Sequence, residues 1–253
     1  KEMNRMAYWG YYEFIRDRLK SVEAPSILEI GVDKGQMFLP LLSYLTANHE
    51  EFILSGVDIK FDEAMQIKLQ IMENELDSNK QFLLFYEDSS LNVLPRFTSF
   101  MKETNQEGMF DVILVDGDHN YHTVSQEFRH VPGLLKPGGM IIVDDYSGRW
   151  AHQDEYFSEL PEYKDNKFAT KREDTEHPEK KGVKPAIDEF LENNPEWSST
   201  DAVQAGSDPL LVFRRGELEL VYKTDPDQNP LTEEELLEIS NKEKNEEDEV
   251  KND

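Results

Sequence analysis

The ten residues SILEIGVDKG, at positions 26–35, decide the expected fold class of this chain. A short apolar run ends there in Gly31, and Gly35 follows where a helix is expected to begin. An apolar run of this length, bounded by a glycine turn, is typical of a buried strand. Glycine lets the backbone turn sharply at the first position and lets a ligand or a helix approach closely at the second. The stretch therefore predicts a strand, a tight turn and a helix, although a G-x-x-x-G turn alone also fits a purely structural role.

The same order of strand and helix recurs further along the chain. More strands are expected at residues 52–58, 82–86, 110–115 and 140–143. Helices are expected at 36–47, at 61–77, from just after residue 90 to about 103, and at 123–131. Strands that alternate with helices at this spacing predict an α/β fold with a doubly wound, mostly parallel sheet. Ligands bind such sheets beyond the carboxyl ends of the strands. We therefore expect the residues at those ends to meet in one crevice: Gly31, Asp58, Asp88, Asp116 and Asp144.

The chain is expected to have one main domain between two terminal segments. Residues 1–25 form an N-terminal helical segment, because apolar and aromatic side chains recur at helical spacing between positions 8 and 20. Residues 26–223 form the main domain. Within it, residues 147–184 are rich in charged and aromatic side chains without a regular period, which predicts a long excursion or lid.

The C-terminal part holds further elements and an acidic tail. A helix is expected at 185–193, and strands at 210–213 and 218–222 are expected to form a hairpin. Residues 224–253 form the tail, which from position 232 carries ten acidic residues against three lysines. A segment of this composition buries little apolar surface, so we expect it to be disordered or a frayed helix.

The composition excludes several classes of function. There are 53 acidic and 27 basic residues, and the formal net charge of −26 repels phosphate backbones and anionic lipids. Nucleic acid is therefore not expected as a partner unless a local basic patch overrides the net field. The chain has no cysteine, so it has no disulfide, thiolate metal site or cysteine nucleophile. No apolar run reaches the length of a membrane span, and no signal peptide is visible, so we expect a cytoplasmic location.

Two acidic strand ends suit the binding of a nucleoside. Asp58 comes 27 residues after Gly31, and a carboxylate there is able to accept hydrogen bonds from both hydroxyls of a ribose. Asp88 and Ser89, after the third strand, are placed to accept from the exocyclic amine of adenine. Aspartate and serine also cap helices, so both positions are equally compatible with a structural role.

In this order, the motifs resemble those of the class I S-adenosylmethionine-dependent methyltransferases. The resemblance extends from about residue 27 to 213 and includes the Leu-Lys-Pro-Gly-Gly turn at 135–139. It implies a seven-stranded sheet with an antiparallel terminal strand, in which the hairpin between 210 and 222 supplies the last two strands. It also implies that S-adenosylmethionine is bound by Glu29, Gly31, Gly35, Asp58, Asp88, Ser89 and Asp116.

The sharpest motif is Asp116-Gly117-Asp118-His119, followed after the next strand by Asp144-Asp145. Carboxylates at adjacent strand ends repel one another unless a cation lies between them, and such oxygen ligands suit Mg²⁺, Mn²⁺ or Ca²⁺. The alternative is that these residues cap helices, form turns or lie solvated at strand ends.

The pattern resembles the metal-dependent macrocin O-methyltransferases, which are related to cephalosporin hydroxylase-like proteins. This resemblance implies that Asp116, Asp144 and Asp145 bind Mg²⁺ and that Asp118 is the catalytic base. An imidazole from this part of the chain, that of His119 or His122, is the alternative base, since an imidazole titrates near neutral pH.

The predicted function is therefore magnesium-assisted O-methylation of a small molecule or sugar by an enzyme that uses S-adenosylmethionine. A metal clamp favours an acceptor with two neighbouring oxygens, such as a vicinal diol. The aromatic residues Trp150, Tyr156, Phe157 and Tyr163 either line the acceptor pocket or pack within the lid. Two alternatives remain: another reaction on the same fold, or a non-catalytic module that binds the cofactor or a partner. A homo-oligomer is compatible with the sequence.

Overall fold

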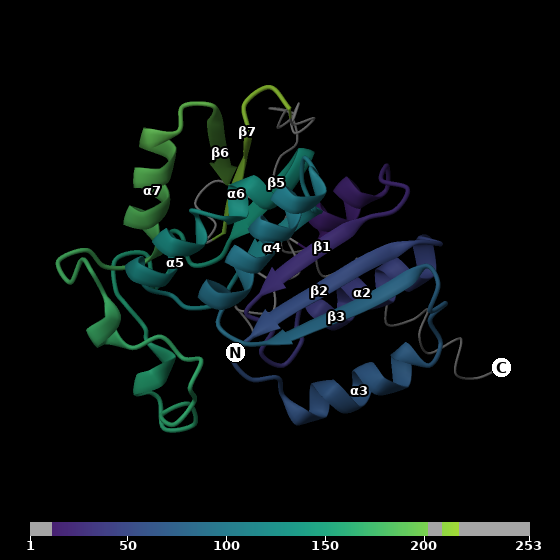
Figure 1. The fold of residues 1–253 in the computed structure, drawn as a ribbon, viewed down its shortest axis with the longest axis horizontal. Coiled ribbons are helices and arrows are strands. Elements are labelled where there is room, and N and C mark those ends of the chain that lie inside the picture. The colour runs from purple at the N-terminus through teal and green to yellow at the C-terminus, as the bar shows by residue number, and fades with distance from the viewer. Residues whose placement is uncertain (1–11, 202–208, 218–253) are drawn as a thin grey trace, which may run out of the picture. The chain divides into compact units, whose positions relative to one another are not determined.

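The computed structural model describes residues 12–201 and 209–217, and these form a three-layer α/β fold around one sheet (Figure 1). The strands are β1 (Ser26–Ile30), β2 (Phe52–Asp58), β3 (Gln81–Glu87), β4 (Phe110–Val115), β5 (Leu135–Val143), β6 (Trp197–Asp201) and β7 (Leu210–Arg214). The helices are residues 12–19, α2 (Phe38–Asn48), α3 (Glu63–Glu73), α4 (Ser90–Thr104), α5 (Tyr121–Glu127), α6 (Val131–Leu134) and α7 (Val183–Asn193). Two 3₁₀ turns, η1 (Phe157–Glu159) and η2 (Arg172–Asp174), lie between β5 and α7.

The sheet has seven strands in the order β3-β2-β1-β4-β5-β7-β6. Strands β1 to β5 are parallel to one another, and β7 is antiparallel to both β5 and β6. This confirms the predicted mostly parallel sheet with an antiparallel terminal strand. The carboxyl ends of β2, β1, β4 and β5 consequently lie side by side at one edge of the sheet, where the predicted site residues stand.

The prediction of the last two strands was partly wrong. The partner of β7 is β6, at Trp197–Asp201, whereas the expected partner at 218–222 lies outside the described residues. The sequence WSSTD carries one large apolar residue, Trp197, which is buried while the residues after it are partly or fully exposed. An edge strand of this kind has no alternating apolar pattern, so periodicity does not reveal it. The predicted tail, 224–253, also lies outside the described residues.

The helix expected at 123–131 is two helices, α5 and α6. Asn120 caps the first, because its Oδ1 accepts a hydrogen bond of 2.8 Å from the Thr123 amide. Pro132 lies in the first turn of the second, where a missing N–H does not interrupt helical hydrogen bonding. The Asn120 cap places the start of α5 directly after Asp118 and His119.

The core is built from alternating strand residues on the two faces of the sheet. Leu28 of β1 and Val57 of β2 pack in one apolar cluster with Val93 of α4, Val124 of α5 and Ile187 of α7. The opposite face is covered by α2, as Figure 1 shows. All five residues of β1 are buried, because the strand lies between these two layers. This central strand leads into the glycine turn at the site. No helix within the described residues is long and apolar enough to cross a membrane.

Candidate active site

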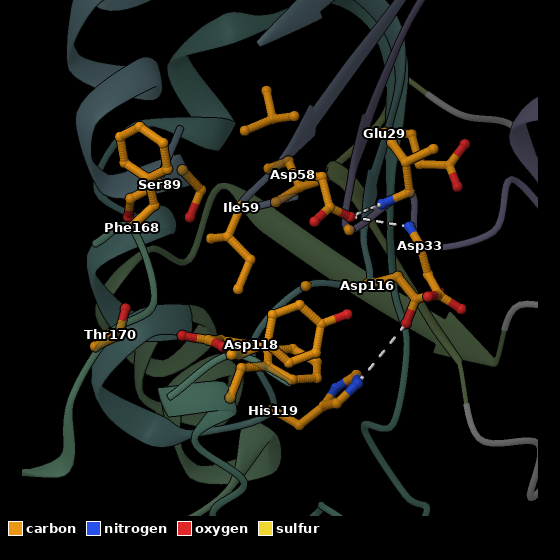
Figure 2. Close-up of a pocket in the computed structure, with 18 of the residues that line it drawn as sticks. Glu29, Asp33, Asp58, Ile59, Ser89, Asp116, Asp118, His119, Phe168 and Thr170 are labelled. Carbon is orange, nitrogen blue, oxygen red and sulfur yellow. Dashed lines mark hydrogen bonds and ion pairs between the residues drawn. The ribbon is translucent and has the colours of Figure 1, made fainter. Parts of the chain in front are cut away.

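A pocket of about 290 Å³ lies beyond the carboxyl ends of β1 to β4 (Figure 2). This volume is near the lower end of the range for small-molecule sites. The structure brings the following predicted site residues together in the pocket lining: Glu29, Gly31, Asp58, Asp88, Ser89, Asp116, Asp118 and His119. Gly35, Asp144 and Asp145 are not part of that lining. The lid between β5 and α7 supplies the remaining wall of the pocket.

Gly31 is held in a conformation that no other residue adopts at low energy. Its φ is +87°, and a Cβ atom at this position would lie 2.0 Å from the carbonyl oxygen of Asp116. The Gly31 amide donates to Val57 O, and the Asp116 amide donates to Ile30 O, so the turn is fixed between two neighbouring strands. Gly35 also has a positive φ, but it faces the Met65 side chain of α3 rather than the pocket.

Asp58 holds the glycine turn with its carboxylate. Its Oδ2 accepts hydrogen bonds from the amides of Val32 and Asp33, at 2.8 and 2.9 Å, and its Oδ1 accepts one from the Lys60 amide at 3.0 Å. Burial raises the pKa of Asp58, and these amides oppose the rise. A carboxylate has about four acceptor positions, so three are used here. In this arrangement Asp58 is able to accept one further hydrogen bond from a ribose rather than two.

Glu29 is a buried carboxyl group at the end of β1. Burial raises its pKa well above its ordinary value, and the charge of Asp58 raises it further. Its Oε2 is buried and has no hydrogen-bond partner among residues 12–201 and 209–217. A buried polar atom of this kind is destabilising unless a ligand pairs with it. Glu29 therefore fits a ligand that brings a positively charged or hydrogen-bond-donating group into this pocket.

Asp88 and Ser89 directly precede α4, and both form hydrogen bonds with residues of that helix or with each other. The Asp88 carboxylate accepts from the Ser89 amide and Asn92 Nδ2, both at 2.8 Å, and it pairs with Arg96 at 2.9 Å. The Ser89 hydroxyl accepts from the Leu91 amide at 3.2 Å, which makes it the N-cap. Both residues line the pocket, and their hydrogen bonds at the helix end are those of the structural role that the sequence left open.

Asp116, Asp144 and Asp145 form an acidic group around His119, and this group extends from the pocket toward β5. His119 lies between two carboxylates, with its Nδ1 3.5 Å from Asp145 Oδ2 and its Nε2 4.0 Å from Asp116 Oδ1. Burial raises the pKa of Asp116 well above its ordinary value, and the charge and hydrogen bond of Asp144 raise it further. Burial lowers the pKa of His119, and Asp144 opposes this, so the imidazole stays neutral to a lower pH than an ordinary histidine does.

Asp145 adopts a left-handed backbone conformation, with a φ of +54°, in this group. A strained backbone at a non-glycine residue is typical of functional sites, because the surrounding structure has to maintain it. Within the described residues, however, no three His, Asp or Glu side chains lie where they would hold a metal ion. The predicted ligands Asp116, Asp144 and Asp145 are thus neighbours, but their present side-chain positions do not form a metal site.

Asp118 points away from this acidic group. Figure 2 shows its carboxylate directed toward Thr170 and not toward His119. Its Oδ2 accepts a hydrogen bond of 2.9 Å from Thr123 Oγ1. Burial raises the pKa of Asp118 to about 6, although the hydrogen bonds from Thr123 and Thr170 oppose the rise. Of Asp118 and His119 as candidate bases, His119 is therefore the one that lies beside Asp116 and Asp145.

The lid contacts both sides of the pocket. Asn166 Nδ2 donates to Ile59 O, just beyond β2, at 2.8 Å. On the other side, the Glu155 amide donates to His119 O at 3.0 Å, and Asp154 Oδ1 accepts from the Tyr121 amide at 3.1 Å. The lid residues that line the pocket are Phe157, Leu160, Glu162, Tyr163, Phe168 and Thr170.

The sequence predicted only part of this lid. Phe157 and Tyr163 line the pocket, whereas Trp150 does not, and Tyr156 is buried beneath the guanidinium of Arg172. Asn166 was missed, because a polar residue in a segment without a period carries no signal of its long-range partner.

A family model described as a methyltransferase domain matches residues 28–146. Residues 28–146 thus carry a methyltransferase domain, on the fold of the class I S-adenosylmethionine-dependent methyltransferases. The matched segment runs from the glycine turn of β1 through the acidic group after β5. No curated protein sequence matches the chain.

Solved structures of methyltransferases are similar to this one in fold. The TDP-rhamnose 3'-O-methyltransferase CalS11, from calicheamicin biosynthesis, is 12% identical, with a TM-score of 0.51 over 85% of this chain and 80% of that chain. MycE from mycinamycin biosynthesis, solved with Mg, S-adenosylhomocysteine and mycinamycin VI, is 15% identical, with a TM-score of 0.46 over 88% and 51%. The methyltransferase PaMTH1 of Podospora anserina is 17% identical, with a TM-score of 0.43 over 81% and 76%. At these identities the comparison with CalS11 shows a shared fold.

Proposed function

We propose that this methyltransferase transfers the methyl group of S-adenosylmethionine to a hydroxyl oxygen of a small molecule or sugar. The observation that carries the proposal is the position of His119. Its ring lies between Asp116 and Asp145, at the rim of the pocket that begins at the glycine turn. A neutral imidazole among carboxylates is suited to remove a proton from a hydroxyl group, which is a poor nucleophile until the proton leaves.

The methyl donor would be bound by the part of the pocket around β1 and β2. Glu29 offers a buried carboxyl oxygen without a partner to the ammonium group of the donor. Asp58 offers its remaining acceptor position to a ribose hydroxyl, while it keeps the glycine turn in place. These residues orient the donor, and orientation alone contributes several kcal/mol to a displacement in which two reactants are aligned.

The acceptor would lie beside His119, where the proton is removed. Burial lowers the pKa of His119, so its neutral, proton-accepting form persists below the ordinary value of 6.5. The carboxylates of Asp116 and Asp145 would then stabilise the imidazolium that forms. Asp118 remains a second candidate base, and its pKa of about 6 suits that role, but its hydrogen bond with Thr123 directs it elsewhere.

A divalent cation is part of the proposal, held by Asp116, Asp144 and Asp145. The chemistry of the donor set supports it, since three carboxylates at adjacent strand ends match the preference of Mg²⁺ for oxygen ligands. Burial and, after it, the charge of Asp144 raise the pKa of Asp116, and such a cation would offset the repulsion between the two carboxylates. Their side chains would have to rotate to face a common point. When bound, the cation would make the acceptor hydroxyl more acidic and fix its orientation.

A sugar is one candidate for the acceptor. CalS11 is named as a sugar O-methyltransferase, and this chain shares its fold. The acidic group by itself favours any acceptor with two neighbouring oxygens, such as a vicinal diol, a catechol or a sugar.

The proposal is tested by measuring transfer of a labelled methyl group to a panel of sugars, nucleotide sugars and catechols, with Mg²⁺ or with EDTA. We expect methylation of a hydroxyl group that requires Mg²⁺, and we expect His119→Gln to lower kcat while the affinity for S-adenosylhomocysteine is kept. His122→Gln, in the first turn of α5, is the matched control. Methylation only of amines, or equal activity of His119→Gln and His122→Gln, would refute the proposal. Loss of activity in Asp118→Asn alone would make Asp118 the base.

A further inference from the structure

Strand β3 forms an open edge of the sheet. Within the described residues it pairs with β2 and with no other strand. The five residues between Gln81 and Glu87 are all apolar, with the sequence FLLFY. The register with β2 runs over seven consecutive residue pairs without a bulge, so the strand is regular. Proteins usually protect an open edge with a charge, a proline or a bulge, and none of these occurs between Gln81 and Glu87.

Large apolar side chains are exposed on both faces of this edge. On the face that carries α4, Phe82 is 42% exposed, Leu84 is 39% exposed and Ile53 of β2 is 37% exposed. Phe100 of α4 is also exposed, at 48%. On the other face Phe85 contacts two aromatic rings of the core and is still 38% exposed. An uncovered apolar surface of this kind marks a contact site on a water-soluble protein.

The backbone of β3 is ready to pair at the open side. Lys80 O accepts from the Phe52 amide, and the Asp88 amide donates to Asp58 O, so the even-numbered residues direct their backbone groups toward β2. Because these directions alternate along a strand, residues 81, 83, 85 and 87 direct their N–H and C=O groups outward. A partner strand added here would form backbone hydrogen bonds and cover both apolar faces together.

We propose that this edge binds β3 of a second copy of the chain, antiparallel, with the two-fold axis at Leu84. The sequence is self-complementary in this register. Leu84 lies opposite Leu84, Phe82 lies opposite Tyr86, and Leu83 lies opposite Phe85, so apolar side chains meet throughout. At each end Lys80 of one copy lies opposite Asp88 of the other, which places opposite charges together.

The neighbouring registers lack this complementarity. With the axis at Leu83, Gln81 lies opposite Phe85 and Lys80 lies opposite Tyr86. With the axis at Phe85, Leu83 lies opposite Glu87 and Phe82 lies opposite Asp88. Both arrangements place polar groups against apolar ones. A two-fold interface has the same surface on both copies, so this self-complementarity selects a second copy as the occupant.

The absence of cysteine from the chain permits a sharp test of the register. Leu84 would form a pair without backbone hydrogen bonds across the axis, in which the two Cα atoms are about 4.5 Å apart. This distance lies within the range that a disulfide spans. We therefore expect Leu84→Cys to form a disulfide-linked dimer under mild oxidation. Phe82→Cys, on the same strand and face, should not link to itself, because its partner is Tyr86. Asn193→Cys, at an exposed position of α7, is a control away from the edge, because α7 lies at the opposite side of the sheet from β3 (Figure 1).

Light scattering on the unmodified full-length protein provides the second measurement. We expect a dimer whose dissociation constant rises about tenfold or more in Leu84→Lys, since two like charges then face each other at the axis. Asn193→Lys should leave the dissociation constant unchanged, and circular dichroism should show that both variants are folded.

Three outcomes would overturn the proposal. The first is a protein that stays monomeric and a Leu84→Cys variant that does not link. The second is a dimer that Leu84→Lys does not weaken. The third is a monomer in which the Leu84→Cys thiol resists a thiol reagent, because another segment or partner then covers the edge.

Discussion

Glu127→Gln is expected to make the stability of the protein much less dependent on pH. Glu127, at the end of α5, is fully buried. Burial raises its pKa from 4.5 to about 8, the Ser90 hydroxyl opposes the rise, and the charge of Asp118 adds to it. The folded protein therefore keeps a proton on this carboxyl group at neutral pH, whereas the unfolded chain loses it.

The sign of the effect follows from these two values. Below pH 4.5 both states are protonated, and the carboxyl group adds no pH dependence. As the pH rises toward 8 the unfolded chain ionises and is favoured, so the free energy of unfolding falls. Each unit of difference between the two pKa values corresponds to about 1.4 kcal/mol. The difference between 4.5 and about 8 thus corresponds to on the order of 5 kcal/mol above pH 8, and to about 3 kcal/mol at pH 7.

Urea titration from pH 5 to pH 8 measures this effect. The glutamine variant cannot ionise, and any loss from burying its amide is the same at every pH. We therefore expect the stability of Glu127→Gln relative to the unmodified protein to increase steadily with pH. Glu103→Gln, at an exposed position of α4, is the matched control and should show no such trend. Parallel stability curves for Glu127→Gln and the unmodified protein would refute the reasoning.

Three further predictions concern the site. Gly31→Ala should lower the melting temperature strongly, in addition to weakening the binding of S-adenosylmethionine, because the alanine Cβ would lie 2.0 Å from Asp116 O. An unchanged melting temperature would contradict this. Asn166→Ala should raise the dissociation constant of S-adenosylhomocysteine by roughly 2- to 10-fold in calorimetry, since one hydrogen bond from the lid to Ile59 is lost. Mg²⁺ should raise the melting temperature of the unmodified protein and not of Asp145→Asn, because the cation binds the folded state; equal shifts would exclude Asp145 as a ligand.

The sequence predicts the strand ends better than the directions of their side chains. Apolar runs and the residues that follow them place Gly31, Asp58 and Asp116 at one edge of the sheet, because this depends only on strand order. Whether a side chain at such an end faces the ligand depends on its other partners. Asp118 is drawn toward Thr123 by a hydrogen bond, whereas its neighbour His119 joins the acidic group. Nothing in the spacing of Asp-Gly-Asp-His distinguishes the two.

The long-range contacts of polar residues could not be predicted from the sequence either. Glu127 looks like an ordinary acidic residue of a helix, and only the packing of α5 shows that it is buried beside Asp118. β6 was missed because its single buried residue, Trp197, gives no period. In both cases tertiary packing, and not local pattern, determines the environment.

The lid has a consequence for the order of events in the reaction. It is hydrogen-bonded to Ile59 on one side of the pocket and to His119 and Tyr121 on the other, so it spans the proposed donor site. A molecule beneath the lid leaves only after one of these hydrogen bonds breaks. We therefore expect S-adenosylmethionine to enter first and S-adenosylhomocysteine, the spent donor, to depart last. Its residence time would be determined by how often the hydrogen bond of Asn166 breaks. Turnover would then be limited by the exit of the spent donor, and a faster enzyme would be obtained by loosening the lid rather than by altering the acids below it.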